Sequence, residues 1–305
     1  MREAFVNTLI NEAKKDPNII LITGDLGFGV LEKYSENLEN QFINSGINEQ
    51  TMMGMAAGIA STGKRVFVYS IGNFSTLRCL EQVRNDVCLM NNPVVIVSVG
   101  AGYSYGNQGY THHALEDIAV MRSLPNLDVI VPADPIETAF ITKYLAVTNK
   151  PAYLRIGKSS EINLHTNEFI FDYGKIFELS SGEDGTFIFS GAVGKIAIEA
   201  RDLLLKSGYV VAVASMPFVS NIDESYLRSA SQKGPIVVVE EHAYRGGVGS
   251  AILEKINKLL LEVPIALVAS DQRNLSEIGD QNFLRQQNGI SAENIVSKYM
   301  ALLVN

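Results

Sequence analysis

Short apolar runs alternate with longer segments of helical periodicity along most of the chain. The apolar runs are rich in β-branched residues and lack polar alternation, which is typical of parallel strands covered on both faces. They occupy residues 19–23, 65–70, 94–99, 129–131, 152–156, 186–190, 210–214, 236–240 and 265–269. Helical patterns lie at residues 2–15, 49–62, 77–90, 135–148, 192–206, 248–261 and 292–303. This alternation predicts an α/β fold with two doubly wound, mostly parallel sheets.

The alternation lapses between Lys158 and Gly185, where the sequence is polar, irregular and interrupted by glycines. A chain of 305 residues has room for two domains, since domains average about 150 residues. We therefore predict a first domain over residues 1–165, a linker over 166–184 and a second α/β domain over 185–305.

Composition narrows the range of partners. The chain carries 25 Lys and Arg against 33 Asp and Glu, a formal net charge of −8, without a basic cluster. This balance argues against nucleic acid or an anionic membrane as the main partner. Cys79 and Cys88 make neither a disulfide framework nor a metal knuckle, so we expect a reducing cytoplasm. The charge-free stretch 87–115 contains an Asn-Asn-Pro turn and several glycines, so it predicts a strand entering a loop, not a membrane span.

Ligands of open α/β sheets bind beyond the carboxyl ends of the strands, so the loops there hold the candidate residues. Glu49 opens a helical segment rich in Met, Ala and Gly. An acid in a first helical turn is often favoured only by the helix dipole. However, small residues such as Gly54 and Gly58 would let this helix pack closely, and a carboxylate withdrawn from water suits proton transfer. Both interpretations stay open at this point.

Two other loops contain candidate residues. His112 and His113 end the glycine-rich loop, and because adjacent side chains on an extended loop point in opposite directions, at most one should face a pocket. No His-x-x-x-His or cysteine pair completes a zinc site, so no metal site is predicted, and a structural loop histidine is the alternative. Phe74 follows the strand at 65–70, where it is either a core residue or a platform for a flat heterocycle. In the second domain, residues 240–242 and 246–249 look like a catalytic pair and a phosphate loop, although glycines there also allow close packing.

Taken in order, these clusters resemble the transketolase family, which includes 1-deoxyxylulose-5-phosphate synthase. The resemblance is closer to the small-subunit form, in which the enzyme is divided over two chains. The matching motifs are Gly24-Asp25-Leu26, residues 42–50, Arg78 with residues 81–85, Gly109-x-Thr111-His112 with Glu116-Asp117, Pro132-Ala133-Asp134 with Glu137-Thr138, Tyr153-Leu154-Arg155, and residues 239–242 with 246–249. The resemblance implies the pyrimidine-binding domain of a thiamine diphosphate enzyme followed by a transketolase C-terminal-like domain.

The resemblance also implies roles for single residues. Glu49 contacts the ring nitrogen of the cofactor's aminopyrimidine, which promotes loss of the thiazolium proton, while Phe74 stacks on the pyrimidine. His112 serves proton transfer and hydroxyl recognition near the reacting carbonyl. The implied cofactor-binding residues are Glu49, Phe74, Arg78, Gln82 and Asp25, and the implied substrate-binding residues are His112, Gln108, Lys158 and Arg155.

Three positions depart from the family pattern. Gln108 replaces an acidic residue that reads a donor hydroxyl, and Gly100 aligns with a histidine that helps to bind the substrate phosphate. Lys158 stands where the family usually has a phosphate-binding arginine, so a point charge replaces a bidentate fork. We therefore expect an unusual sugar substrate, such as a modified or nucleotide-linked one.

The chain lacks the Gly-Asp-Gly motif with which thiamine diphosphate enzymes hold Mg²⁺ and the diphosphate. It therefore resembles half of an active site. We expect an N-terminal transketolase subunit to supply the diphosphate and Mg²⁺ domain, in an α2β2 heterotetramer with the cofactor between unlike subunits.

The leading hypothesis is transfer of a two-carbon ketol unit from a ketose donor to an aldehyde acceptor. The first alternative, the β subunit of a 2-oxo-acid dehydrogenase decarboxylase, normally lacks the Gly-x-Thr-His-x-x-x-Glu-Asp pattern. The second, a condensation like that of 1-deoxyxylulose-5-phosphate synthase, is disfavoured by the division into two chains. The third, a non-catalytic regulatory subunit, is disfavoured because Glu49, Phe74 and His112 are retained.

Overall fold

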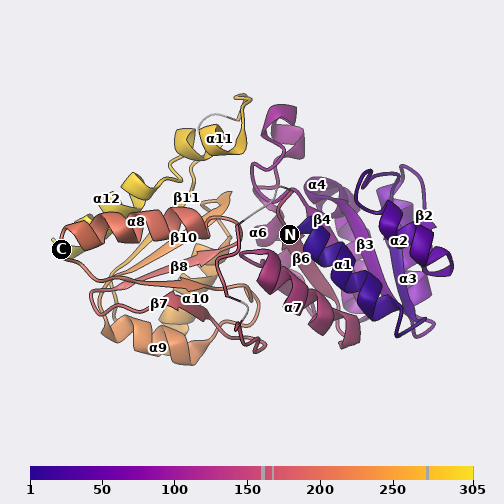
Figure 1. Ribbon diagram of the computed structural model, residues 1–305, viewed down its shortest axis with the longest axis horizontal. Coiled ribbons are helices and arrows are strands. Elements are labelled where there is room, and N and C mark those ends of the chain that lie inside the picture. The colour runs from indigo at the N-terminus through magenta and orange to yellow at the C-terminus, as the bar shows by residue number, and fades with distance from the viewer. Residues whose placement is uncertain (159–161, 167, 273–274, 305) are drawn as a thin grey trace.

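The computed structural model describes residues 1–158, 162–166, 168–272 and 275–304. Two α/β domains lie side by side; the N-terminus is near the middle of the molecule and the C-terminus at the far end of the second domain (Figure 1). Each domain contains one sheet covered by helices. The predicted fold class, with two mostly parallel sheets, is confirmed. No helix in the described ranges is long and apolar enough to span a bilayer.

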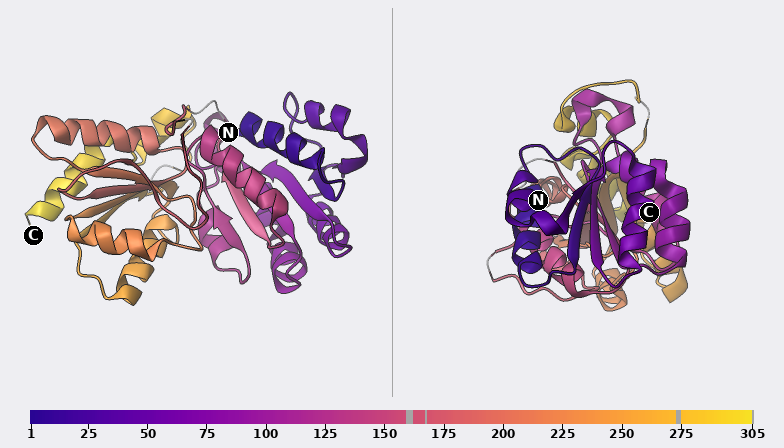
Figure 2. Two further views of the ribbon diagram at one scale, coloured as in Figure 1. Left: turned by 60° about the horizontal axis from the view of Figure 1, so that its bottom comes forward. Right: turned by 90° about the vertical axis from the view of Figure 1, so that its right-hand side faces the viewer.

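The first sheet, in the described part of the chain, has six parallel strands in the order β2-β1-β3-β4-β6-β5. Their bounds are Ile19–Thr23 (β1), Phe42–Asn44 (β2), Arg65–Ile71 (β3), Val94–Val99 (β4), Asp128–Ile130 (β5) and Ala152–Ile156 (β6). Helices α1 (Arg2–Ala13) and α7 (Pro135–Val147) cover one face, and α3 (Glu49–Ala60) covers the other. The end-on view of Figure 2 shows this sheet between its helices. Because both faces are covered, the central strands are apolar throughout.

The second sheet has the order β11-β10-β8-β9-β7 and is parallel except for β7, which runs antiparallel to β9. Its strands are Phe177–Ser180 (β7), Thr186–Ser190 (β8), Ala212–Ser215 (β9), Ile236–Ala243 (β10) and Ile265–Ser270 (β11). Helices α8 (Gly194–Lys206) and α12 (Ala292–Leu303) cover one face, while α9 (Glu224–Gln232) and α10 (Val248–Leu259) cover the other. Shorter helices are α2 (Glu32–Asn37), α4 (Gly72–Ser75), α5 (Leu80–Gln82), α6 (Asp117–Arg122) and α11 (Gln281–Gln287).

The structure differs from the predicted elements in several places, and helices α2, α6, α9 and α11 lie in segments where no helix was predicted. The helix predicted over residues 77–90 is a 3₁₀ turn at Leu77–Cys79, a helical turn at Leu80–Gln82 and a π-helical segment at Val83–Leu89. Such wide turns are frequent at functional sites, and they keep an apolar pattern that resembles an α-helix. The edge strands β2 and β7 were not predicted, and β7 lies within the predicted linker 166–184. Both are too short and too polar to form a continuous apolar run.

Backbone hydrogen bonds join the two domains at the edge of the first sheet. The segment after β9 pairs antiparallel with β5, where Ile130 lies opposite Phe218. Val131 donates to the carbonyl of Pro217 at 2.8 Å, and Val219 donates to that of Val129 at 2.9 Å. The second domain thereby covers an edge strand that would otherwise expose unpaired backbone groups.

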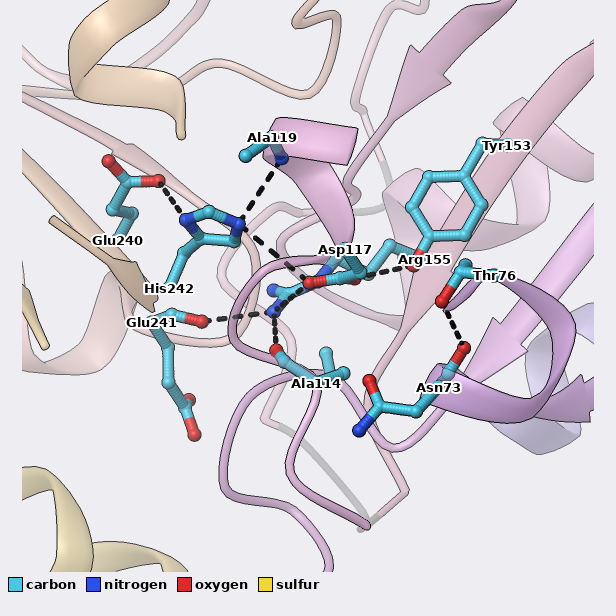
Figure 3. A network of polar contacts seen from close by, with 12 residues as sticks. Asn73, Thr76, Ala114, Asp117, Ala119, Tyr153, Arg155, Glu240, Glu241 and His242 are labelled. Atoms are coloured by element: carbon cyan, nitrogen blue, oxygen red, sulfur yellow. Dashed lines mark hydrogen bonds and ion pairs between the residues drawn. The ribbon is translucent and has the colours of Figure 1, made fainter. Parts of the chain in front are cut away.

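A buried ion pair within the first domain also reaches the second domain, through a hydrogen bond of its guanidinium (Figure 3). Arg155 on β6 and Asp117 at the start of α6 have side chains that are 2% and 0% exposed, with Nε 2.6 Å from Oδ2. Arg155 Nη2 also donates to the carbonyl oxygens of Ala114, at 2.7 Å, and Glu241, at 3.0 Å, and Glu241 belongs to the second domain. Burial alone raises the pKa of Asp117, but Arg155 and His242 outweigh it and hold that pKa below its ordinary value. The pair therefore stays ionised inside the protein.

Replacing Asp117 by Asn tests this ion pair, because the Arg155 guanidinium then stays buried without a counter-charge. We expect the free energy of unfolding to fall by about 3 to 5 kcal/mol, as for other broken buried pairs. The measurement is urea unfolding followed by circular dichroism at neutral pH. Since folding lowers the pKa of Asp117, its contribution is complete above the ordinary carboxyl pKa of 3.8 and disappears as the pH falls further.

The matched control for this experiment is Asp172→Asn, because Asp172 is exposed. We expect that change to alter the free energy of unfolding by less than about 0.5 kcal/mol. An Asp117→Asn protein as stable as the control would show that the ion pair does not stabilise the fold.

Candidate active site

Glu49 lies at the start of α3, beside the carboxyl end of β1. Its side chain is only 4% exposed, although it is the first residue of its helix. Arg78 Nη1 lies 2.8 Å from Glu49 Oε2 and donates a hydrogen bond to it. Among the described residues the buried carboxylate is paired with the Arg78 cation, whose side chain is itself 45% exposed.

Phe74, on the short helix α4 after β3, contacts the same arginine. The guanidinium carbon of Arg78 lies 4.1 Å from the centre of the Phe74 ring. Glu49 and Phe74 thus present a carboxylate and an aromatic face to one flat group that carries N–H donors. This pair of side chains fits the flat, nitrogen-bearing heterocycle expected from the sequence, provided that Arg78 moves away into solvent.

His112 lies between two aromatic rings, and a cationic side chain lies against each of these rings. Its ring centre is 5.3 Å from that of Phe74 and 6.0 Å from that of Tyr105. Arg78 lies over Phe74, and Lys158 Nζ lies 4.3 Å from the centre of the Tyr105 ring. We call these five residues the ring row. It extends from Arg78, beside the carboxylate of Glu49, at one end to the ammonium of Lys158 at the other.

The surroundings of His112 keep its imidazole neutral. Partial burial, and then the positive charges of Arg78 and Lys158, lower the pKa of His112 below its ordinary value of 6.5. Nδ1 lies 3.0 Å from the hydroxyl oxygen of Thr111. A neutral imidazole beside a partly open site is suited to exchange protons with a substrate hydroxyl.

The adjacent histidines have different surroundings, as expected for neighbours on a loop. His113 is 2% exposed and its Nε2 lies 3.2 Å from the carbonyl oxygen of Gly106. Its ring meets that of Tyr103 edge to face, at 5.2 Å. His113 is therefore a packed loop residue, whereas His112 belongs to the ring row.

A cavity of about 640 Å³ lies between the two domains and adjoins the ring row. The first domain contributes Tyr105, Gln108 and Lys158 to its walls. The second domain contributes Lys195 at the start of α8 and Asp280 and Arg285 on or next to α11. A sugar-sized ligand fits in this volume.

The remaining predicted site residues lie elsewhere. Asp25 is exposed, and its backbone and carboxylate both hydrogen-bond the Asn44 side chain, at 3.0 and 3.1 Å. Gln82 has a buried Oε1 without a hydrogen-bond partner in the described residues, so this acceptor is unsatisfied. Arg155 is held in the ion pair with Asp117, so the structure does not bring its side chain to the ring row.

The acidic pair of the second domain is structural. Glu240 accepts hydrogen bonds from the backbone of Val248, at 2.7 Å, and Gly249, at 2.8 Å, so it already occupies the start of α10. Glu241 accepts one from the backbone of Tyr103, at 2.6 Å, and pairs with Arg285. The contacts of Glu241 hold the loop after β4 against the second domain. The carboxylate of Glu240 occupies the backbone N–H groups that a phosphate would need at the start of α10, so residues 246–249 do not form a phosphate loop. No group of three or more His, Cys, Asp or Glu side chains in the described ranges is arranged to hold a metal ion.

Tyr105 and Arg285 are among the residues of the site that sequence reasoning missed. Tyr105 lies in a loop without a motif, and its only signal was the unexplained glycine at position 100. Arg285 lies far along the chain from every recognised motif. Arg285 comes to the site through the packing of one domain on the other, whereas Tyr105 comes to it through the tertiary fold of the first domain, against Gly100 and Lys158. No local sequence pattern encodes either contact.

Comparisons with known proteins agree with this geometry. The family model for the transketolase pyrimidine-binding domain matches residues 1–161, and that for the transketolase C-terminal domain matches residues 174–295. One of the subunits of apulose-4-phosphate transketolase from Phocaeicola vulgatus is 33% identical over 297 residues, which are 96% of this chain and 94% of that protein. A subunit of 6-deoxy-6-sulfo-D-fructose transketolase from a Clostridium species is 28% identical, with 97% and 92% covered.

Among solved structures, a split-gene transketolase in the form of an inactive β4 tetramer superposes with a TM-score of 0.92 at 30% identity. The superposition covers 99% of this chain and 98% of the other. Both domains and their relative arrangement are therefore shared with that protein.

Replacing Lys158 by Gln tests the electrostatic account of His112. Removing one of the two nearby cations should raise the pKa of His112, because a like charge no longer opposes protonation. The imidazole C–H resonance of His112, followed by NMR during a pH titration, reports this change. Lys14→Gln, an exposed change just after α1, should leave the titration where it is. A pKa that stays constant or falls in the Lys158 variant would contradict the account.

Proposed function

The chain belongs to the transketolase family, and on that premise we propose that it forms the pyrimidine-binding half of the active site in a split enzyme. The enzyme transfers a two-carbon ketol unit from a ketose to an aldehyde. Thiamine diphosphate, when bound, supplies the carbon that accepts and releases this unit. The observation that carries the proposal is the shared contact of Glu49 and Phe74 with one flat cationic group.

Glu49 and Phe74 would hold the aminopyrimidine end of that cofactor. The carboxylate would hydrogen-bond a ring nitrogen, and the aromatic face would stack on the ring. Arg78 now fills this role with its own guanidinium and is exposed enough to turn outward. Gln82 offers a buried amide oxygen without a partner in the described residues, which supports its assignment as a further cofactor contact. Asp25, at the exposed rim of the same edge, stays a prediction.

His112 acts on the substrate. Its imidazole is kept neutral by burial and two cations, so it can take a proton from a sugar hydroxyl and return it. Gln108 lines the cavity where a donor hydroxyl is read in the family, with an amide in place of a charge. Lys158, at the far end of the ring row, would bind the anionic end of the sugar.

An anionic end also fits what the relatives are named for. One is named for apulose-4-phosphate and another for 6-deoxy-6-sulfo-D-fructose. These names specify a phosphate on one sugar and a sulfo group on the other. We propose that the sugar of this enzyme likewise carries an anionic group, and that it is not one of the usual ketose phosphates, because Gly100 and Gln108 depart from the family pattern.

A second chain completes the proposed enzyme. The chain lacks a Gly-Asp-Gly motif, and the Phocaeicola vulgatus relative is named as one subunit of a transketolase. We propose that an N-terminal transketolase subunit ligates Mg²⁺ and the diphosphate, in an α2β2 assembly with the cofactor between unlike subunits. The two free cysteines are buried, and burial raises the pKa of Cys79 to about 12 and that of Cys88 to about 11. Unreactive free thiols are compatible with the cytoplasm that we propose as its location.

Replacing Glu49 by Gln in the assembled two-subunit enzyme tests the function directly. We expect at least about a hundredfold loss of ketol transfer, since a positioned acid–base group contributes roughly that much or more. The exchange of the thiazolium proton for deuterium, followed by NMR, should slow in parallel. Glu36→Gln, an exposed change on α2, is the matched control and should leave both rates unchanged.

Two results would contradict this proposal. Deuterium exchange at the wild-type rate in the Glu49 variant would remove that residue from its role. Consumption of a 2-oxo acid with release of CO₂, without two-carbon transfer, would assign the enzyme to decarboxylation instead.

A further inference from the structure

We propose that Tyr105 is a specificity-determining residue that positions the Lys158 ammonium for an oxyanion, a phosphate or sulfonate, at the end of the sugar. The identity of the sugar rests on the proposed function. The binding of an oxyanion by Lys158, which Tyr105 positions, does not rest on it. Three features of the structure carry this proposal: the space beside Gly100, the position of Lys158, and the cavity in front of both.

The ring of Tyr105 fills the space that a side chain at position 100 would need. A Cβ built on Gly100 would lie 2.1 Å from Cε2 and 2.2 Å from Cδ2 of Tyr105. Gly100 also has a φ of +91°, a backbone conformation that favours glycine. A side chain at position 100 and an aromatic ring at 105 therefore exclude one another. Position 100 is where the resemblance places a phosphate-binding histidine, so in this chain a tyrosine has taken that volume.

The same ring supports Lys158. Its ammonium lies 4.3 Å from the centre of the Tyr105 ring, a typical cation–π contact. In the part of the chain that the structure describes, Lys158 forms no ion pair and no hydrogen bond through Nζ. Among the described residues its ammonium thus has no acidic partner, and its long flexible stem lies against an aromatic face.

The cavity gives the ammonium room for a ligand. Tyr105, Gln108 and Lys158 share the wall of the cavity of about 640 Å³. The other cations of this wall already have acidic partners, because Arg285 pairs with Glu241 and Lys195 lies 3.7 Å from Glu199. Lys158 is thus the uncommitted positive charge of the wall among the described residues, and it faces a space large enough for the end of a sugar.

The arrangement explains which anions fit. An ammonium is a point charge with three rotatable donors. It can therefore donate hydrogen bonds to a tetrahedral phosphate or sulfonate without requiring the paired oxygens that a guanidinium prefers. His112 lies next to Tyr105 in the ring row, with ring centres 6.0 Å apart. Tyr105 therefore lies between the proton-transfer group and the ammonium of Lys158.

The experiment compares Tyr105→Leu with Tyr105→Phe in the enzyme assembled with its partner subunit. The acceptors are glyceraldehyde 3-phosphate, the same aldehyde with a terminal sulfonate, and uncharged glyceraldehyde. Without the ring, we expect KM for the charged acceptors to rise about fivefold, the effect of losing one cation–π contact. We expect kcat, and KM for glyceraldehyde, to stay within about twofold. Tyr105→Phe keeps the ring and should behave as the wild type.

A double-mutant comparison separates positioning from a general structural effect. Lys158→Gln should raise KM for the charged acceptors by about tenfold or more, the effect of losing a charge-assisted contact. In that background Tyr105→Leu should add nothing, because the ring then has no ammonium to position. Tyr244→Leu, at an exposed tyrosine of the second domain, is the matched control and should change neither KM. A rise for only one of the two charged acceptors would assign the site to that oxyanion.

Equal rises in KM for charged and uncharged acceptors would overturn the proposal, and so would a Tyr105→Phe protein that behaves like Tyr105→Leu. A readout without turnover keeps the proposal separate from the proposed function. Inorganic phosphate titrated calorimetrically into the full chain should bind more weakly to the Tyr105→Leu and Lys158→Gln proteins. An assembled enzyme that transfers no ketol unit would overturn the proposed function, while the phosphate titration would still decide the role of Tyr105.

Discussion

The ion pair of Asp117 with Arg155 is the interaction on which the rest of the site depends. Asp117 follows the histidine loop, Arg155 lies on a central strand, and the guanidinium also holds the carbonyls of Ala114 and Glu241. Burying two charges is favourable only when their hydrogen bonds are satisfied, and here backbone carbonyls from both domains satisfy them. His112, two residues before Ala114, is thereby fixed relative to the sheet, and the second domain is fixed relative to His112.

Within that frame, cations and aromatic rings determine the chemistry of the ring row. Arg78 and Lys158 lie at its two ends, and both lower the pKa of His112 in addition to the larger effect of burial. The same two cations contact Phe74 and Tyr105, so each positive charge lies against a ring. The cavity beside the row thus has a positive charge in its wall, while the imidazole between the rings stays neutral. Arg78 contacts the carboxylate and the ring that a flat cofactor would use, so in the proposed complex it would turn away from both.

Sequence patterns predicted the parallel core of the fold because buried strands must be apolar on both faces, as the runs at 19–23 and 94–99 are. They missed β2 and β7, which are short and partly exposed, and they merged the broken turns of residues 77–90 into one helix. Glu49, Phe74, Arg78 and His112 came together as expected, because loops after parallel strands share one edge of the sheet. Arg155 did not, since it lies inside a strand and points to a buried acid, whereas Lys158, just past the strand end, reaches the cavity. The exclusion between Gly100 and Tyr105 is a tertiary contact that no spacing reveals.

We propose that this chain holds one half of a thiamine diphosphate site and needs a second subunit for the other. The most direct measurement is calorimetric binding of thiamine diphosphate with Mg²⁺ to this chain, to the N-terminal subunit, and to an equimolar mixture, with two-carbon transfer assayed in the same three samples. We expect tight binding and transfer in the mixture alone. Tight binding or transfer by this chain without its partner would contradict the claim.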